Sequence, residues 1–209
     1  METTGSRGGK TAAACSRKTC SGCPIEGKLL CLHTPRDVLD FAVLAIGFFI
    51  PFIAGMAIGG FWIALALWFG LAVIFFGYVE ALVLCRHCPH YAEEGFLLRC
   101  HANYGFPKIP RFSPRPLNRV EKIVFLGYVS VLLFYYVPFF LVSKQWLLLI
   151  IGSWALVAWF WTLLRTQCTR CYHIFCPLNR VPEDVRREFF NNYPAFSEAR
   201  KRRRPRSVA

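Results

Sequence analysis

The sequence predicts an all-α integral membrane protein in which four transmembrane helices form two hairpins, with a cysteine-rich surface layer on the cytoplasmic side. Of the 209 residues, 55% are hydrophobic and only 18% are charged, whereas a soluble domain carries about 25% charged residues. Residues 41–79, 123–143 and 145–164 contain no charged side chain. A spanning helix needs roughly 20 apolar residues, so the first stretch holds two spans and the others hold one each. All ten cysteines fall outside these stretches.

The first hairpin covers residues 41–84. Its first span runs from Phe41 to about Ile58, the glycine pair at 59–60 provides a tight turn, and its second span runs from Phe61 to about Leu84. Pro51 lies inside the first span, where it lacks the backbone donor that an α-helix requires, and it therefore predicts a kink.

The second hairpin covers residues 123–164. Its spans run from Ile123 to about Val142 and from residue 145 to about Leu164, and Ser143 and Lys144 form the whole connection between them. Pro138 predicts a kink in this hairpin, as Pro51 does in the first.

Three polar segments complete the chain. Residues 1–40 form a basic, cysteine-containing tail that does not resemble a secretory signal peptide. The loop at 85–122 is rich in Cys, His and Pro, and its prolines predict an extended path over the membrane surface. Residues 165–209 contain further cysteines, a helix from about Pro182 to Asn191 with Phe189 and Phe190 as membrane-facing anchors, and a polybasic tail.

The basic residues predict the orientation in the membrane. Every one of the 25 Lys and Arg residues except Lys144 lies in the three polar segments, and positively charged flanks stay in the cytoplasm. We therefore expect a multi-pass membrane protein with cytoplasmic termini, in the inner membrane if the source is prokaryotic. The net charge of +13 is then expected to contact anionic lipids and possible membrane protein partners. Without a nucleic-acid-binding motif, this charge does not indicate a nucleic-acid partner.

A C-x2-C-x-H pattern follows each hairpin. Cys85, Cys88 and His90 follow the first, and Cys168, Cys171 and His173 follow the second. The order of kinked helix, tight turn, helix and C-x2-C-x-H is thus repeated, which indicates a parallel internal repeat of the kind found in transporters.

The repeated pairs predict a metal site. Clustered cysteines in a reducing compartment more often bind metal than form disulfides, and two C-x2-C pairs can complete a tetrahedral site. If the second and fourth spans pack side by side, the four thiolates of Cys85, Cys88, Cys168 and Cys171 meet at the membrane surface. The metal would be zinc, iron or an iron–sulfur cluster. Further candidate ligands lie nearby in the sequence: Cys100, His101, Cys176, His90 and His173.

The amino-terminal tail has the pattern C-x4-C-x2-C-x7-C, made by Cys15, Cys20, Cys23 and Cys31. Its first three cysteines resemble plant-type iron–sulfur ligation, and Cys-Pro pairs like those of bacterial ferredoxins recur in the chain. The whole chain is similar in architecture to four-helix membrane proteins of electron-transfer chains that carry Cys-Pro motifs beside the membrane, although the motif spacings differ. A disordered tail with scattered thiols is the alternative for this segment.

Three functions remain open from the sequence. The first is a metalloprotein that passes electrons through an iron or iron–sulfur site. The second is a scaffold or subunit that is held together by structural zinc. The third is a thiol–disulfide oxidoreductase in which Arg86, His87 or Arg170 lowers the pKa of a neighbouring thiol. Incidental buried cysteines are the simplest alternative. No histidine lies within a span, so a haem held by two histidines inside the bundle is excluded, and Glu80 is the only charged residue there.

Overall fold

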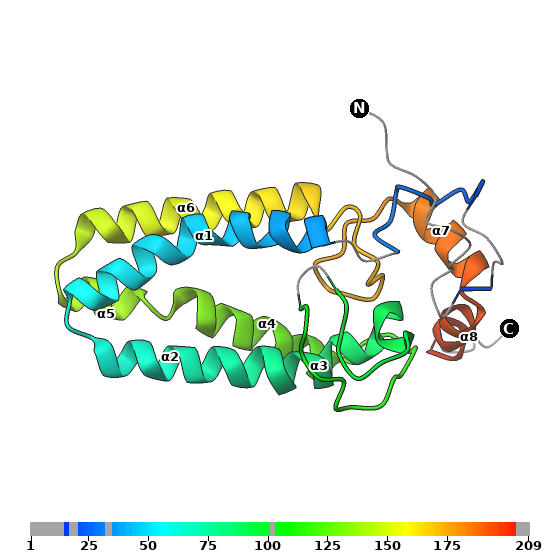
Figure 1. The fold of residues 1–209 in the computed structure, drawn as a ribbon, viewed down its shortest axis with the longest axis horizontal. Helices are drawn as coiled ribbons and strands as arrows, with labels where there is room; N and C mark the ends of the chain where they lie inside the picture. Colours follow the sequence, from blue (N-terminus) through cyan, green and yellow to red (C-terminus); the bar gives the residue numbers. More distant parts are fainter. Residues whose placement is uncertain (1–14, 17–20, 32–34, 101–102, 204–209) are drawn as a thin grey trace, which may run out of the picture.

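The computed structural model describes residues 15–16, 21–31, 35–100 and 103–203 (Figure 1). The regular structure of these residues is helical, and the described part of the chain contains one isolated β-bridge, between Leu97 and Pro107, and no strand. Four segments are long and apolar enough to cross a membrane, at Phe41–Ile58, Trp62–His87, Arg119–Val142 and Trp146–Thr166. The predicted all-helical class with four candidate spans is therefore confirmed.

The spans are divided into helices of different length. The first is α1 (Pro35–Ile58), and the second is made of α2 (Trp62–Ile74), a π-helical turn η1 (Phe75–Val79) and α3 (Glu80–Val83). Two short 3-10 turns follow, η2 (Cys85–His87) and η3 (Pro89–Ala92). The remaining helices are α4 (Arg119–Phe134), α5 (Val137–Val142), α6 (Trp146–Thr166), α7 (Glu183–Asn192) and α8 (Pro194–Arg203).

The two prolines inside the predicted spans have different effects. Pro51 stays within α1, which continues past it. The third span is instead interrupted, because α4 ends at Phe134 and a new helix, α5, begins at Val137. Pro138 lies in the first turn of α5, where its missing N–H has no intrahelical acceptor to lose.

The four spans form two pairs that converge at one end. α6 packs mainly against α1, α2 packs against α1 and α4, and α5 packs against α6. The short connection within each hairpin, between the first and second spans and between the third and fourth, lies at one end, and the cysteine-bearing loops lie at the other end with α7 and α8 (Figure 1). The second and fourth spans are thus not close neighbours in the described structure. The four-thiolate site was predicted on the condition that these two spans pack side by side, and this condition is not met.

An aromatic core joins the spans. Phe48 stacks on Phe52 with ring centroids 6.0 Å apart, and Tyr136 contacts both rings edge-on. Hydrogen bonds across the bundle add to this packing: the Trp68 indole N–H donates to the Leu132 carbonyl at 2.9 Å, and similar bonds join Tyr135 to Ala64 and Gln145 to Gly55. Such bonds satisfy polar groups that the bilayer cannot solvate.

A second core lies beyond the spans, where α7 and α8 cover the loop after α6. The predicted helix is present as α7, but the interpretation of Phe189 and Phe190 as membrane anchors is wrong, because these rings are 0% and 8% exposed. They pack instead among Tyr172, Tyr193 and Phe196. The sequence pattern identified the helix but could not show what covers it.

The close approach of α1 to α5 gives a test of the fold. A Cβ added at Gly55 would overlap the ring of Phe140, which is fully buried. Overpacking of this kind costs about 1–3 kcal/mol, so we expect Gly55→Ala to lower the apparent melting temperature of the purified protein by several degrees. Gly70→Ala is the matched control, because a Cβ there meets no heavy atom within 4 Å. Equal melting temperatures for the two variants would contradict the packing.

Candidate metal centre

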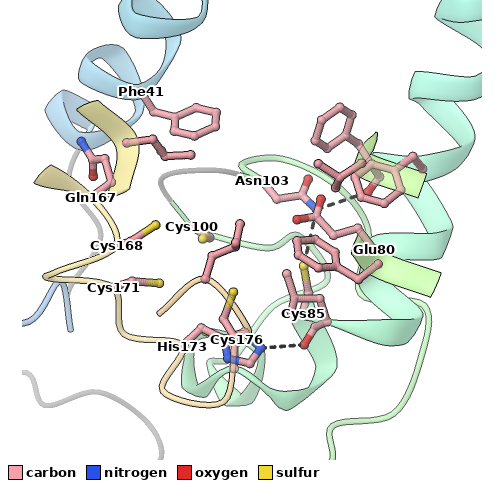
Figure 2. Close-up of a pocket in the computed structure, with 18 of the residues that line it drawn as sticks. Phe41, Glu80, Cys85, Cys100, Asn103, Gln167, Cys168, Cys171, His173 and Cys176 are labelled. Carbon is pink, nitrogen blue, oxygen red and sulfur yellow. Dashed lines mark hydrogen bonds between the residues drawn. The ribbon is translucent and has the colours of Figure 1, made fainter. Parts of the chain in front are cut away.

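A cavity of about 200 Å³ lies between the two helix pairs at the end that carries the loops. Six cysteines line it, and they come from three separate segments of the chain: Cys85, Cys88, Cys100, Cys168, Cys171 and Cys176. Figure 2 shows that the five of these thiols labelled there are directed toward the same space. No disulfide joins any of the nine cysteines that the structure describes. The cavity is therefore surrounded by reduced sulfur.

The first cysteine pair is carried by the tight turn that ends the second span. The Cys88 N–H donates to the Cys85 carbonyl at 2.9 Å, which closes the 3-10 turn η2. The backbone N–H of His90 then hydrogen-bonds to the Cys88 sulfur. Both thiols are buried, at 7% and 5% exposure. This turn explains why a C-x2-C sequence places two sulfurs at one helix end.

The second pair follows α6 in a less regular loop. The Cys168 N–H still donates to the Leu163 carbonyl at 2.9 Å, and the backbone N–H of His173 hydrogen-bonds to the Cys171 sulfur as His90 does to Cys88. The Asn179 side chain closes the loop, because its amide donates to the carbonyls of Cys171 and His173, both at 3.1 Å. The two C-x2-C-x-H motifs thus share one local feature, an N–H to sulfur bond from the residue two positions after the second cysteine.

The four predicted ligands reach one cavity but do not converge on a single point. In the described part of the chain, no three His, Cys, Asp or Glu side chains lie close enough together to hold one ion. The cysteines are instead spread around the cavity, with Cys168 and Cys171 on one side and Cys85 on the other (Figure 2).

The additional candidate ligands have different positions. Cys100 and Cys176 line the cavity, and so do His90 and His173. The His90 ring nitrogens lie 3.0 Å from the Glu93 carboxylate and 3.1 Å from the Leu30 carbonyl. The His173 Nε2 lies 2.9 Å from the Leu84 carbonyl, and its Nδ1 is buried without a partner. His173 thus joins the loop after α6 to the end of the second span, and His90 joins its own loop to the amino-terminal segment. His101 lies outside the described residues.

Asn103 is a site residue that the sequence patterns did not predict. Its side-chain amide donates to the Cys85 sulfur at 3.6 Å, to the Glu80 carboxylate at 3.1 Å and to the Phe76 carbonyl at 3.2 Å. Asn103 and Glu80 are 2% and 7% exposed, and both line the cavity. Glu80 is therefore part of the cavity wall. No sequence motif marks Asn103, which reaches Cys85 from a loop residue 18 positions later.

A buried carboxylate fixes the first cysteine turn to α4. Asn118 and Glu121 form a capping box at the start of α4, with reciprocal bonds of 2.7 and 2.8 Å. The Glu121 carboxylate also accepts hydrogen bonds from Arg86 at 2.9 Å and Arg115 at 2.6 Å, and it lies 3.2 Å from the His87 ring. Arg86 and His87 are the two residues between Cys85 and Cys88, so this network positions the turn.

The pKa values of the thiols reflect their surroundings. Burial raises the pKa of Cys88 and Cys171 well above the ordinary value, and it raises the pKa of Cys168 to about 11 and of Cys176 to about 12. Burial also lowers the pKa of His173 to about 4, so this ring is neutral at pH 7. Without a bound cation, these four thiols are therefore neutral at pH 7.

The amino-terminal cysteines lie elsewhere. Cys15, Cys23 and Cys31 pack against the second core, and none of them lines the cavity. The Asn192 side chain is 3.8 Å from the Cys23 sulfur, and the Ser16 N–H donates to the Asn192 carbonyl at 2.9 Å. Cys20 is outside the described residues.

Comparisons with protein-family models, with curated proteins and with solved structures find no match to this chain.

The raised thiol pKa values predict a loss of stability at alkaline pH. Cysteines in the unfolded chain lose their protons near pH 8.5, whereas Cys168 and Cys176 in the folded protein keep theirs to about pH 11 and 12. Rising pH therefore favours the unfolded state, by about 1 kcal/mol for Cys176 at pH 9.5. We expect the melting temperature of chelator-treated protein to fall between pH 7.5 and 9.5. The fall should be smaller in a Cys168→Ser/Cys176→Ser variant, and a flat profile in both proteins would contradict the assignment.

Proposed function

We propose that this protein is a multi-pass membrane metalloprotein that binds an iron–sulfur cluster at the cytoplasmic end of its helix bundle and passes electrons through it. The observation that carries the proposal is the single cavity lined by six cysteines from three segments. Four cysteine thiolates are the usual ligands of [2Fe–2S] and [4Fe–4S] clusters, and the cavity offers more than four. Cys85, Cys88, Cys168 and Cys171 are the proposed ligands, and Cys100 and Cys176 are the alternatives to any one of them.

The spread of the thiols favours a cluster over a single zinc ion. A tetrahedral zinc site needs four ligands within about 2.3 Å of one point, and the described residues contain no such preformed group. In a cluster each thiolate binds its own iron atom or shares one with a single other thiolate, so the thiolates surround the cluster and need not meet. A cavity with sulfur on several sides matches this second requirement.

The surroundings of the thiols also support an electron-transfer role. Backbone N–H groups at His90 and His173 and the Asn103 amide hydrogen-bond to the sulfurs of Cys88, Cys171 and Cys85. Hydrogen bonds to sulfur and exclusion of solvent are two of the main factors that set the reduction potential of a cluster.

A thiol–disulfide oxidoreductase is less well supported. Such enzymes need an exposed thiolate with a lowered pKa. Burial instead raises the pKa of Cys88, Cys168 and Cys171, and Arg86 contacts Glu121 and His87 rather than a sulfur.

We further infer that the cysteine-bearing end faces the cytoplasm. Every Lys and Arg of the chain except Lys144 belongs to residues 1–40, 85–122 or 165–209, and the described parts of these segments lie at that end (Figure 1). Basic flanks are retained on the cytoplasmic side. Contact of these segments with anionic lipid follows from the same charge.

Metal content tests the proposed cluster. Protein purified without oxygen should be brown and should contain iron and acid-labile sulfide in equal amounts, because the cluster types with four cysteine ligands contain both. Cys85→Ser and Cys171→Ser should each lose most of the iron, because both sulfurs line the cavity. Cys23→Ser is the control and should keep its iron, since Cys23 packs against the second core and does not line the cavity.

Three outcomes of the metal measurement would have different meanings. Colourless protein with about one zinc per chain would replace the cluster with the structural zinc site. Metal-free protein that folds normally would reject both kinds of site. Iron that is lost equally in the Cys23 variant would reject the cavity as its location.

Chemical labelling tests the orientation. Lys144 is exposed in the turn between α5 and α6, so a membrane-impermeant amine reagent added to intact cells should modify it. The same reagent should reach Lys201 only after lysis. Lys144→Arg keeps the charge and should abolish labelling of intact cells, whereas modification of Lys201 in intact cells would reverse the proposed topology.

A further inference from the structure

The cavity continues beyond the thiols into the membrane-spanning part of the bundle. Trp68, Leu132 and Trp159 line it together with the cysteines, although Trp68 lies in the middle of α2, Leu132 in the last turn of α4 and Trp159 in the second half of α6. Twelve residues separate Trp68 from Glu80, which corresponds to about 18 Å along a helix. The cavity is therefore elongated, with a sulfur-lined end at the surface and an aromatic-lined end within the bilayer.

The π-helical turn η1 shapes the wall of this cavity. Phe75, Phe76 and Glu80 line it and lie in or directly after the turn Phe75–Val79. A π-turn inserts an extra residue into a helix, changes the direction of the side chains that follow and occurs frequently at functional sites. Here it allows two adjacent aromatic rings and the following carboxylate to border one space.

Buried polar atoms along the cavity lack partners. The Trp159 indole N–H and the Asn103 side-chain carbonyl are both buried and make no hydrogen bond, and both residues line the cavity. Trp68 shows the ordinary arrangement, because its indole N–H donates to the Leu132 carbonyl. A buried polar group without a partner is costly and needs an explanation. One donor and one acceptor inside an apolar cavity fit a ligand that supplies the complementary groups.

We propose that the cavity binds a lipid-soluble quinone or quinol. A quinol ring can accept from the Trp159 N–H at one oxygen and donate from a hydroxyl to the Asn103 carbonyl, whereas a quinone can only accept. Either ring can pack against Phe76, Trp159 and their aromatic neighbours. No lysine or arginine is among the described residues that line the cavity, so an anionic head group such as a phosphate or carboxylate would have no cationic partner there. The apolar, elongated shape suits a long hydrocarbon tail.

This ligand would lie beside the thiols in the same cavity. The inference that it exchanges electrons with a cluster there rests on the proposed function. Its binding does not, because the aromatic walls and the Trp159 N–H belong to helices, and the Asn103 carbonyl belongs to a loop residue that is not a proposed metal ligand. The two proposals can therefore fail separately.

A fluorescent quinol analogue, 2-heptyl-4-hydroxyquinoline N-oxide, tests the site on the purified full chain in detergent. We expect saturable quenching with about one site per chain. Val129→Trp should weaken binding at least tenfold, because Val129 lines the cavity and a larger side chain would fill it. Val131→Trp is the matched control on the same helix, since Val131 is 54% exposed on its outer face, and its affinity should equal that of the wild type.

Trp159→Phe provides an independent variant that keeps most of the side-chain volume. Loss of its N–H should weaken binding about fivefold. Unchanged affinity in both the Val129 and the Trp159 variants would overturn the proposal, as would uptake that rises linearly without saturation in every protein. The titration is repeated on a Cys85→Ser/Cys171→Ser variant. Binding that persists there without iron separates this site from the metal centre, and iron without saturable binding overturns the quinone site alone.

Discussion

The position of the candidate centre depends on one buried carboxylate. Glu121 begins α4 through its capping box and also binds Arg86 and Arg115. Because Arg86 lies between Cys85 and Cys88, the start of the third span and the end of the second are joined at the point where the first two thiols are presented. A carboxylate with only 8% of its side chain exposed needs such partners. The same contacts that compensate the buried Glu121 carboxylate therefore also fix the positions of the Cys85 and Cys88 thiols.

The sequence predicted the parts of the fold that follow from composition and local rules. Long uncharged stretches identified four spans, the acidic residues after Pro182 identified α7, and the C-x2-C-x-H motifs identified segments that reach one cavity. Each of these signals is contained in a short window of residues. The bilayer strengthens them, because it tolerates few alternatives to an apolar helix.

The remaining features depend on contacts between distant segments. Nothing near Asn103 in the sequence indicates that its amide reaches Cys85 and Glu80. The burial of Phe189 and Phe190 depends on α8 and the loop after α6, so a helix with two aromatic residues could equally have met lipid. The neighbours of the spans were likewise not predictable, because apolar helices of similar composition carry little information about which pairs pack together.

The close contact of Gly55 with Phe140 has a mechanical consequence. It lies near the end where both span connections are located, so the two helix pairs are held together there and are separated by the cavity toward the other end. The 24 residues of α1 extend for about 36 Å. A rotation of about 3° around the held end would thus move the far end by about 2 Å. By geometry alone, a small rotation at the held end is therefore enlarged at the end where the thiols lie.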